Sequence, residues 1–330
     1  MDEKTIVVTG GLGFIGGHFI ELCLEKGYRI FNIDKVTYAS NISLNDLFKK
    51  KYPGKYFFIK EDIKDLKEIP FCKYIVHFAA ESHVDNAIRN SQPFIDSNII
   101  GVYNMLMLLV KTRTENQSHF WSAELPTFIY ISTDEVFGDI LEGNFKENDR
   151  YNPSNPYSAT KASAELLLKA WSKTYNINYK ITRTTNNYGS RQHQEKLIPQ
   201  TITRILNGEK VPIFGSGEYI RNWIHVKDNC EAIFLVMTKG EDKEEYHISS
   251  EEEYSTNQIV QIILNHFKKP FDETTVSFGP NRAGQDLRYA LDNSKIKKKL
   301  DWNVKYSLKD SLAEIINYYK LIKNGTNTII

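Results

Sequence analysis

The stretch TGGLGFIGG, Thr9–Gly17, decides the fold of this chain of 330 residues. It follows an apolar, β-branched run that begins at Thr5, and it opens a helical pattern that extends to Lys26. Its glycines have the spacing G-x-x-G-x-x-G, at Gly10, Gly13 and Gly16. Because glycine has no Cβ, such a turn lets the backbone approach a pyrophosphate, which the N-terminus of the helix stabilises. The stretch predicts a dinucleotide site, and the alternative is a plain strand–helix turn.

An acidic residue ends the next predicted strand, Arg29–Asp34. Asp34 lies 18 residues after Gly16, close to the ~20 expected of a carboxylate that binds the adenosine ribose. The same carboxylate would repel a 2′-phosphate, so it predicts NAD rather than NADP, and the adjacent Lys35 weakens that preference. Further cofactor contacts are predicted at Asp62 and Ile63, after the third strand, and at Ala79 and Ala80, at the end of the fourth. Asp62 is alternatively a turn residue. The two alanines would let the cofactor pass close to the end of the fourth strand.

Short apolar runs alternate with helical patterns through the first half of the chain. The predicted strands are Thr5–Thr9, Tyr56–Ile59, Lys73–Ala79, Thr127–Ser132 and Tyr179–Thr184, and the predicted helices are Phe14–Lys26, Leu44–Lys50, Phe94–Lys111 and one from Asn155 to about Lys173. Near-continuous apolar strands separated by helices indicate a parallel sheet with both faces covered. The sequence therefore predicts an α/β fold, an NAD-binding Rossmann domain with a doubly wound parallel sheet.

The second half of the chain is less regular. Helices are predicted at Pro199–Asn207, Asp228–Thr238, Thr256–Phe267 and Leu308–Lys323. We expect residues 1–187 to form the NAD-binding domain and residues 188–330 a smaller, mixed α/β lobe that binds the substrate. Some later segments, such as Trp223–Val226, are expected to return to the first lobe.

Composition argues against several classes of protein. Lysine and arginine total 42 against 41 acidic residues, a net charge of +1, which argues against nucleic-acid or membrane-surface binding. No apolar run reaches the ~20 residues of a membrane span, since Gly101, Tyr103 and Asn104 interrupt the stretch from Ile99 to Val110. The start of the chain is acidic, and Cys23, Cys72 and Cys230 lie far apart. These features predict a reducing, cytoplasmic setting, without a signal peptide, a disulfide framework or a zinc site.

Two residues four apart follow a predicted helix start at Asn155–Pro156. Tyr157 and Lys161 would share one helical face. A tyrosine that acts as a base near neutral pH needs its pKa lowered by roughly three units, about 4 kcal/mol. An ammonium group ~4 Å away supplies about that much at an effective dielectric of ~20. Such a pair occurs by chance in many helices, but beside a dinucleotide site it predicts a base that deprotonates a sugar hydroxyl.

The strand Thr127–Ser132 runs into Thr133, Asp134 and Glu135 at the carboxyl edge of the predicted sheet. Two adjacent carboxylates there can simply be solvated loop residues. Beside a dinucleotide site and the tyrosine–lysine pair, they are the acid and the base that a dehydration requires, with Thr133 bonding the reacting hydroxyl. No metal site is expected, because the remaining histidines of interest show no ligand pattern and predict packing or hydrogen bonding: His77, His83 and His225.

Together these motifs resemble the extended short-chain dehydrogenase/reductase family, and within it the dTDP-glucose 4,6-dehydratases. The resemblance covers nearly the whole chain, through TGGLGFIGG, DKVTYAS (34–40), HFAAESHVD (77–85), ISTDEVFG (131–138), PSNPYSATKA (153–162), NNYG (186–189), EKLIP (195–199) and IRNWIHVKD (220–228). The Thr-Asp-Glu triplet discriminates most, since sugar-nucleotide epimerases and decarboxylases share the glycine motif and the tyrosine–lysine pair but generally lack it.

The resemblance implies a mechanism on a nucleotide-diphosphate sugar, most simply dTDP-glucose. Tyr157, assisted by Lys161 and Thr133, removes the C4 hydroxyl proton while NAD takes the C4 hydride. Glu135 then removes the C5 proton, Asp134 protonates the leaving C6 hydroxyl, and the hydride returns to C6. The implied product is a 4-keto-6-deoxy sugar nucleotide.

The resemblance also implies further contacts. The cofactor would touch Phe14, Ile15 and Asn98, and the nucleotide sugar would touch Ser82, Asn187, Glu195, Lys196, Leu197, Arg221, Arg282 and Gln285. Arg221 is alternatively a surface ion-pair residue. A homodimer is implied, built on the helices at about Phe94–Lys111 and Ala162–Lys173.

Departures from the family pattern leave the substrate open. Ala283 and Gln285 stand where the family usually has proline and histidine, so UDP-glucose or a GDP-linked amino sugar are alternative substrates. Two other functions remain as alternatives. An NAD-dependent epimerase or decarboxylase is disfavoured by Asp134 and Glu135, and a non-catalytic NAD-binding sensor would be expected to lose Tyr157 or Lys161.

Overall fold

A computed structural model describes residues 4–116, 125–281 and 284–325. Its largest element is a seven-stranded sheet in the order β10-β6-β5-β4-β1-β2-β3, with every neighbouring pair parallel. The strands are β1 (Thr5–Thr9), β2 (Arg29–Ile33), β3 (Tyr56–Ile59), β4 (Tyr74–His77), β5 (Thr127–Thr133), β6 (Tyr179–Thr184) and β10 (Glu244–Ile248). The order β3-β2-β1-β4-β5-β6 is that of a doubly wound Rossmann sheet. The predicted fold class is confirmed.

Helices cover both faces of this sheet, which explains why its strands are apolar without interruption. One face bears α1 (Phe14–Glu25), α2 (Ser43–Lys51), α8 (Val226–Lys239) and α10 (Ser294–Leu300), and the other bears α3 (Val84–Arg89), α4 (Gln92–Phe94), the π-helix η1 (Ile95–Ile100), α5 (Gly101–Asn116) and α6 (Pro156–Tyr175). Successive side chains of a strand point to opposite faces. Accordingly Ile6 and Val8 pack in one core cluster and Val7 packs in the other.

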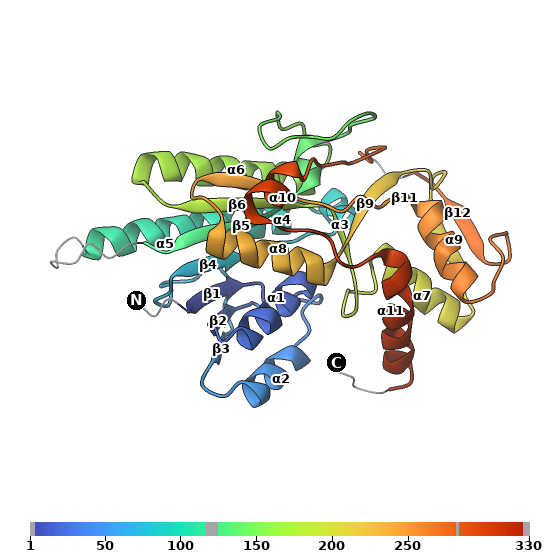
Figure 1. Ribbon diagram of the computed structural model, residues 1–330, viewed down its shortest axis with the longest axis horizontal. Helices are drawn as coiled ribbons and strands as arrows, with labels where there is room; N and C mark the ends of the chain where they lie inside the picture. Colours follow the sequence, from blue (N-terminus) through green and yellow to red (C-terminus); the bar gives the residue numbers. More distant parts are fainter. Residues whose placement is uncertain (1–3, 117–124, 282–283, 326–330) are drawn as a thin grey trace.

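A second, smaller lobe lies beside the carboxyl end of the sheet, on the right in Figure 1. It holds the three-stranded sheet β11-β9-β7, the pair β12-β8, and three helices around one apolar cluster. These elements are β7 (Asn186–Tyr188), α7 (Leu197–Asn207), β8 (Val211–Phe214), β9 (Ile220–His225), β11 (Glu253–Ser255), α9 (Thr256–His266), β12 (Val276–Gly279) and α11 (Leu308–Lys323). The fold is therefore a Rossmann domain with a mixed α/β lobe.

The chain crosses between the lobes more than once. β10, which the sequence did not predict, pairs with β6 in the large sheet, and α8 packs on α1. The stretch Trp223–Val226, which was expected to return to the first lobe, contributes side chains to the cores of both lobes. Trp223 packs in the second-lobe cluster, whereas Ile224 and Val226 pack in the first.

The helices at the site begin where the sequence predicts. Asn155 caps α6 by accepting a hydrogen bond from Ser158 N (3.0 Å), and Pro156 follows at the first helical position. β5 runs into a short 3₁₀ helix, η2 (Asp134–Phe137), capped by Thr133. The acidic pair is thereby placed at the carboxyl end of β5, opposite the first turns of α6.

The helix predicted at Phe94–Lys111 is present as η1 and α5, but the expectation that no apolar run is long enough for a membrane span is wrong. The stretch Gln92–Thr112 is continuously helical and, by length and composition alone, is long and apolar enough to cross a membrane. Gly101 does not interrupt it, because that residue joins the π-helix to α5. Half of its most apolar 18-residue stretch is buried inside the protein, and Val102, Met105 and Leu109 belong to the core under the sheet. Its apolar character is therefore that of a core helix.

Candidate active site

A cavity of about 340 Å³ opens at the carboxyl end of the large sheet. This volume lies within the range of small-molecule sites, and the position, between β1 and β4, is where sheets of this topology bind ligands. The predicted residues that line it are Gly10, Gly13, Phe14, Ile15, Gly16, Asp34, Lys35, Asp62, Ile63, Ala79, Ala80, Ser82, Thr133, Asp134, Glu135, Tyr157, Lys161, Asn187, Glu195 and Lys196. One cavity thus contains the glycine-rich turn, the acidic pair and the tyrosine–lysine pair.

The glycine-rich turn forms one wall of the cavity. Gly10 has a φ of 70°, and a Cβ there would lie 2.6 Å from Ala79 N, so the turn packs directly on the end of β4. α1 starts at Phe14 behind Gly13, which has no side chain to cap the first amides of the helix. Amides of this kind, together with the helix dipole, attract anions. The turn therefore fits a pyrophosphate.

Asp34 is buried at the end of β2 and is held in place by three donors. Its Oδ2 accepts from Leu12 N (3.0 Å), and its Oδ1 accepts from Val36 N (2.8 Å) and Ser40 Oγ (3.2 Å). Val36 has a φ of 63°, which is unusual for a β-branched residue, so the bond from its amide stabilises a strained turn. A carboxylate accepts about four hydrogen bonds, which leaves capacity for ribose hydroxyls.

Lys35 is neutralised by its neighbours. Its Nζ donates to Ser97 Oγ (2.8 Å) and lies 3.6 Å from both Asp62 Oδ2 and Glu81 Oε1. This arrangement leaves little reason for Lys35 to attract a 2′-phosphate. Asp62 also accepts from Lys64 N (3.2 Å) through Oδ1. Asp62 is therefore a turn residue and a lining residue together.

Tyr157 and Lys161 lie one helical turn apart at the base of the cavity. Lys161 Nζ donates to Ile131 O (2.7 Å) and lies 4.1 Å from the centre of the Tyr130 ring. Burial lowers the pKa of Lys161 to about 7. Burial, followed by the charge of Glu135, raises the pKa of Tyr157 above its usual value. The lowered tyrosine pKa that the sequence predicts is therefore not produced by these residues alone, because burial and the charges of Glu135 and Asp134 raise it.

Thr133, Asp134 and Glu135 meet the tyrosine at the end of β5. Thr133 Oγ1 donates to Asp134 Oδ1 (3.1 Å) and accepts from Glu135 N (3.3 Å). Burial, followed by the charge of Glu135, raises the pKa of Asp134 to about 7. Burial also raises the pKa of Glu135, opposed by a hydrogen bond from Asn155 Nδ2 (3.1 Å) and by the charge of Arg221. Asp134 is only 3 % exposed, so the alternative of a solvated loop does not apply.

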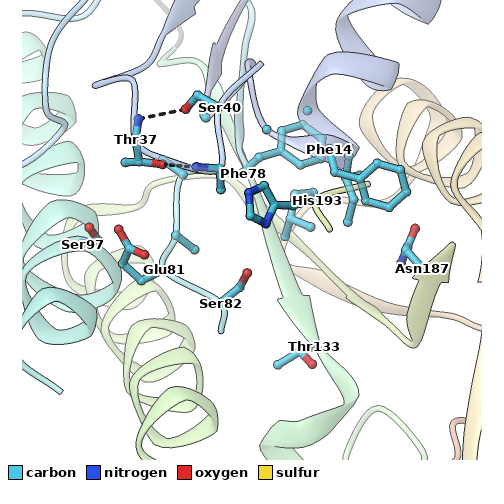
Figure 2. Close-up of a pocket in the computed structure, with 18 of the residues that line it drawn as sticks. Phe14, Thr37, Ser40, Phe78, Glu81, Ser82, Ser97, Thr133, Asn187 and His193 are labelled. Atoms are coloured by element: carbon cyan, nitrogen blue, oxygen red, sulfur yellow. Dashed lines mark hydrogen bonds between the residues drawn. The ribbon is translucent and has the colours of Figure 1, made fainter. Parts of the chain in front are cut away.

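The segment between β7 and α7 closes the opposite side of the cavity. Lys196 Nζ donates to Ser82 O (3.3 Å), across the two lobes. The Glu195 carboxylate lies 3.6 Å from His193 Nδ1. Figure 2 shows the His193 ring between Phe14 and Ser82, with Thr133 below it at the end of its strand.

Two amide oxygens in this wall are buried acceptors without a partner among the described residues, on Asn187 and Gln192. Asn187 Nδ2 donates to Thr184 Oγ1 (3.0 Å) and Thr185 O (2.9 Å). Gln192 Nε2 donates to Asn187 O (2.8 Å). These contacts fix the orientation of each amide, so both free oxygens are acceptors. Such acceptors suit a ligand rich in hydroxyl groups.

Three predicted site residues are placed elsewhere or not described. Asn98 lies buried in the π-helix, where its amide bonds Glu81 N (2.9 Å) and Thr160 Oγ1 (2.9 Å), so it supports the cavity from behind. Leu197 begins α7 and packs against the second-lobe core. Arg282 lies outside the described residues.

Two further predicted residues, Arg221 and Gln285, do not line the cavity. Arg221 donates to Ile220 O (2.7 Å) and Asp286 O (3.0 Å), and its guanidinium lies 4.2 Å from the centre of the Tyr289 ring. It is therefore bound to backbone carbonyls rather than paired on the surface. Gln285 lies in the same loop as Asp286.

The sequence missed several residues that line the cavity. Thr37 and Ser40 follow Asp34 in the DKVTYAS stretch, so their signal was present and was not used. Figure 2 shows the two joined by the hydrogen bond that Thr37 N donates to Ser40 Oγ. Ser97 comes from the π-helix, which a period of 3.6 residues does not reveal.

Comparisons with known proteins match the chain over most of its length. The family model described as GDP-mannose 4,6 dehydratase matches residues 7–315. Low-salt glycan biosynthesis protein Agl12 of Haloferax volcanii is 39 % identical, over 95 % of this chain and 98 % of that protein. The dTDP-glucose 4,6-dehydratase of Haemophilus influenzae is 38 % identical, over 95 % and 97 %. The crystal structure of DesIV, a dTDP-glucose 4,6-dehydratase of Streptomyces venezuelae with NAD bound, is similar with a TM-score of 0.90, 34 % identity and coverage of 98 % and 99 %.

Proposed function

The chain belongs to the GDP-mannose 4,6 dehydratase family, and on that premise we propose that it is an NAD-dependent hydro-lyase acting on dTDP-glucose. Its product is the 4-keto-6-deoxy sugar nucleotide. The observation that carries the proposal is that the buried Asp134 and the half-buried Glu135 lie in the same cavity as Tyr157 and Lys161. An epimerase needs a base at C4 only, whereas loss of water across C5 and C6 needs a second acid and base.

The cavity fits NAD along its length. The turn Gly10–Gly16 would hold the pyrophosphate, Asp34 the adenosine ribose, and Tyr157 with Lys161 the nicotinamide end. The chemistry that NAD supplies when bound is acceptance of the C4 hydride and its return to C6.

Three side chains act on the C4 hydroxyl. The phenolate of Tyr157 takes the hydroxyl proton, and Thr133 bonds the same oxygen. Because burial and neighbouring carboxylates raise the pKa of Tyr157, the phenolate needs a cation close by. The Lys161 ammonium group, fixed on Ile131 O, is that cation, and it serves only while it is protonated.

The two carboxyl groups of η2 carry out the elimination. Once C4 is a ketone, the C5 hydrogen is acidic, and the Glu135 carboxylate removes it as a proton, which it returns to C5 when C6 is reduced. Asp134 gives its proton to the C6 hydroxyl, which leaves as water. Burial raises the pKa of Asp134 to about 7, so this group still carries a proton near neutral pH, while Asn155 and Arg221 favour the anion of Glu135.

The substrate is held by the second lobe in this proposal. We assign the hexose and diphosphate to Ser82, Asn187, Glu195, Lys196 and the start of α7 at Leu197, and the nucleotide end to the loop that follows β12, with Arg221, Arg282 and Gln285. The free acceptor oxygen of Asn187 and the charges of Glu195 and Lys196 support this assignment. Residues 1–187 would hold NAD and residues 188–330 the nucleotide sugar.

We also propose that the protein is a cytoplasmic homodimer. Apolar side chains on η1, α5 and α6 are exposed, including Ile100, Tyr103 and Leu166. The two helices α5 and α6 are in contact, and exposed apolar side chains that gather on neighbouring helices are typical of a protein–protein interface.

The proposed function is tested by incubating the protein and NAD with dTDP-, UDP-, GDP- and CDP-hexoses and recording masses. Loss of one water from dTDP-glucose, abolished in a Tyr157→Phe variant, is the expected result. Loss of water from a UDP- or GDP-sugar instead would change the substrate, and epimerisation without loss of water would overturn the reaction. Binding of NAD with no turnover of any sugar would favour a sensor.

A further inference from the structure

A cluster of buried charges lies directly behind the catalytic helix, outside the cavity. Arg183, on β6, and Glu165, on α6, have no exposed side-chain surface. Arg183 donates from Nε to Glu165 Oε1 (3.1 Å) and from Nη2 to Glu165 Oε2 (2.6 Å). Tyr151 donates its hydroxyl to the same Oε2 (2.8 Å), and Arg183 also pairs with Glu245 on β10. Burying these ions is costly, and full pairing of this kind offsets the cost.

Glu165 shares a helical face with the two residues proposed to act at C4. It follows Lys161 by four residues and Tyr157 by eight, which is about one and two turns. Burial acts to raise the pKa of Glu165, but the charge and hydrogen bonds of Arg183 outweigh it and hold that pKa below its usual range. Burial lowers the pKa of Lys161 to about 7, and the Glu165 charge opposes that effect. A fixed anion therefore lies one turn behind the lysine.

Arg183 also contacts the turn that bears the elimination residues. Its guanidinium carbon lies 4.8 Å from the centre of the Phe137 ring. Phe137 ends the 3₁₀ helix that begins with Asp134 and Glu135. One arginine thus contacts both the turn of the acid–base pair and the helix of the tyrosine–lysine pair.

We propose that Glu165 and Arg183 are positioning residues for the dehydration under Proposed function, on which this inference rests. Glu165 keeps Lys161 a cation against the carbonyl of Ile131. Arg183 fixes Glu165 and the Asp134–Glu135 turn relative to each other. Without Glu165, Lys161 is a buried amine with no counter-ion among the described residues, and it loses its proton at a lower pH.

Few other groups among the described residues around Lys161 could keep it protonated. Facing it are Glu165 and Tyr157 on α6, His77 on β4 and the Tyr130 ring on β5. His77 is neutral, because burial lowers its pKa to about 3. The groups that face Glu165, directly or across Arg183, are Arg183, Tyr130, Tyr151, Lys169, Glu147, Glu245 and His247.

The test uses dTDP-6-deoxyglucose, which can be oxidised at C4 but has no C6 hydroxyl to eliminate. The rise in absorbance at 340 nm then reports the oxidation alone, free of Asp134 and Glu135. In a Glu165→Gln variant we expect the alkaline limb of the pH profile of this oxidation rate to move to lower pH by about one unit or more. A shift of this size is expected for two charges on adjacent helical turns. At pH 8 the rate falls about tenfold and recovers on acidification.

The matched control is Glu245→Gln, which removes the other carboxylate partner of Arg183 but lies on β10. Both variants are expected to lose thermal stability, and only Glu165→Gln moves the limb. Rescue by Glu165→Asp, with the limb restored toward the wild-type position, is also expected. Equal limbs in Glu165→Gln, Glu245→Gln and wild type would overturn the inference.

Two measurements keep the outcomes separate. If the single variant does not fold, Glu165→Gln combined with Arg183→Met removes the pair together, which buried pairs tolerate better. The limb must still move to lower pH, but by less than in the single variant, because a cation is removed together with the anion. Dehydration of dTDP-glucose by the wild type is measured in parallel. Its absence overturns the proposed function, whereas its presence with an unmoved limb overturns only the role of Glu165.

Discussion

Asn155 joins the helix that carries Tyr157 to the carboxylate of Glu135. Its Oδ1 accepts from Ser158 N (3.0 Å) and caps α6, and its Nδ2 donates to Glu135 Oε2 (3.1 Å). Because Oδ1 must accept and Nδ2 must donate, the two contacts fix the orientation of the amide. One side chain therefore sets both the start of the catalytic helix and the pKa of the proposed base.

An Asn155→Asp variant separates these two effects. Aspartate caps a helix about as well as asparagine, so the thermal midpoint is expected to change little. It places a carboxylate where Glu135 had a donor, so the pKa of Glu135, already raised by burial, rises further. Hydrogen bonds to charged groups contribute about 1.5–3 kcal/mol, so the acid limb of kcat is expected to move up by about one pH unit or more. Asn155→Ser, which caps without adding charge, should move it less, and an unmoved limb in both variants contradicts the role of Glu135.

Asp134 links activity to stability. Burial raises its pKa to about 7, whereas in the unfolded chain it ionises near ~3.9. The folded state therefore binds more protons between about pH 4 and 7, so the stability that Asp134 contributes is present below that window and is lost as pH rises through about 7. The loss amounts to at most about 4 kcal/mol. In Asp134→Asn we expect the thermal midpoint to fall less than in wild type between pH 5 and 8, measured by calorimetry.

The same variant has a kinetic signature. Oxidation at C4 does not need Asp134, whereas protonation of the C6 hydroxyl does. With dTDP-glucose, Asp134→Asn should therefore build up absorbance at 340 nm and release 4-keto-6-deoxy product at least tenfold more slowly than wild type. Normal product release would contradict the assignment of Asp134 as the acid.

Asp34 should decide between NAD and NADP. Its carboxylate is fixed by Leu12 N and Ser40 Oγ, and the charge of Lys35 is balanced by Asp62 and Glu81. Wild type is expected to bind NAD far more tightly than NADP in a fluorescence titration. Asp34→Asn should weaken NAD binding about tenfold, the ~1.4 kcal/mol of one hydrogen bond, and reduce the discrimination. Asp62→Asn, a carboxylate of the same cavity, is the control, and an equal loss of discrimination in it would contradict the role of Asp34.

The elements of the large sheet were predictable because both faces are covered. Six of its seven strands fall where the apolar runs lie, and β1, β3 and β6 match to the residue. β10 escaped because its sequence, EEYHI, begins with two glutamates. Glu245 is drawn into the sheet by its pairing with Arg183 and Lys169, which no periodicity reveals.

The residue types of the site could be predicted from the sequence, whereas their pKa values and charge interactions could be predicted less well. Glycine spacing, the ribose carboxylate and the Thr-Asp-Glu triplet all lie in the cavity. The effect of Lys161 on Tyr157 was misjudged, because a pair treated at uniform dielectric omits the desolvation of both groups. Arg221 was predicted to touch the nucleotide sugar, with a surface ion pair as the alternative, whereas here its donors bind the carbonyls of Ile220 and Asp286. The contact with Asp286 depends on a loop distant in sequence.

The proposed homodimer gives a last prediction. Leu166, on the outer face of α6, is 55 % exposed, and it lies on the helix next to that of Tyr103 and Ile100. A glutamate at this position would place a charge in the centre of an apolar interface, where an unpaired charge is strongly disfavoured. Leu166→Glu is therefore expected to elute as a monomer, with light scattering giving half the mass of wild type.

The control for that prediction is Leu141→Glu, a similar change at an apolar residue that is 67 % exposed but lies in the loop between η2 and α6 rather than on either helix. It should keep the wild-type mass. Since Tyr157 and Lys161 lie on the opposite, buried side of α6, a monomeric Leu166→Glu should still bind NAD in a fluorescence titration. A wild type of monomeric mass would contradict the dimer outright. An unchanged dimer in Leu166→Glu would place the interface on a surface other than these two helices.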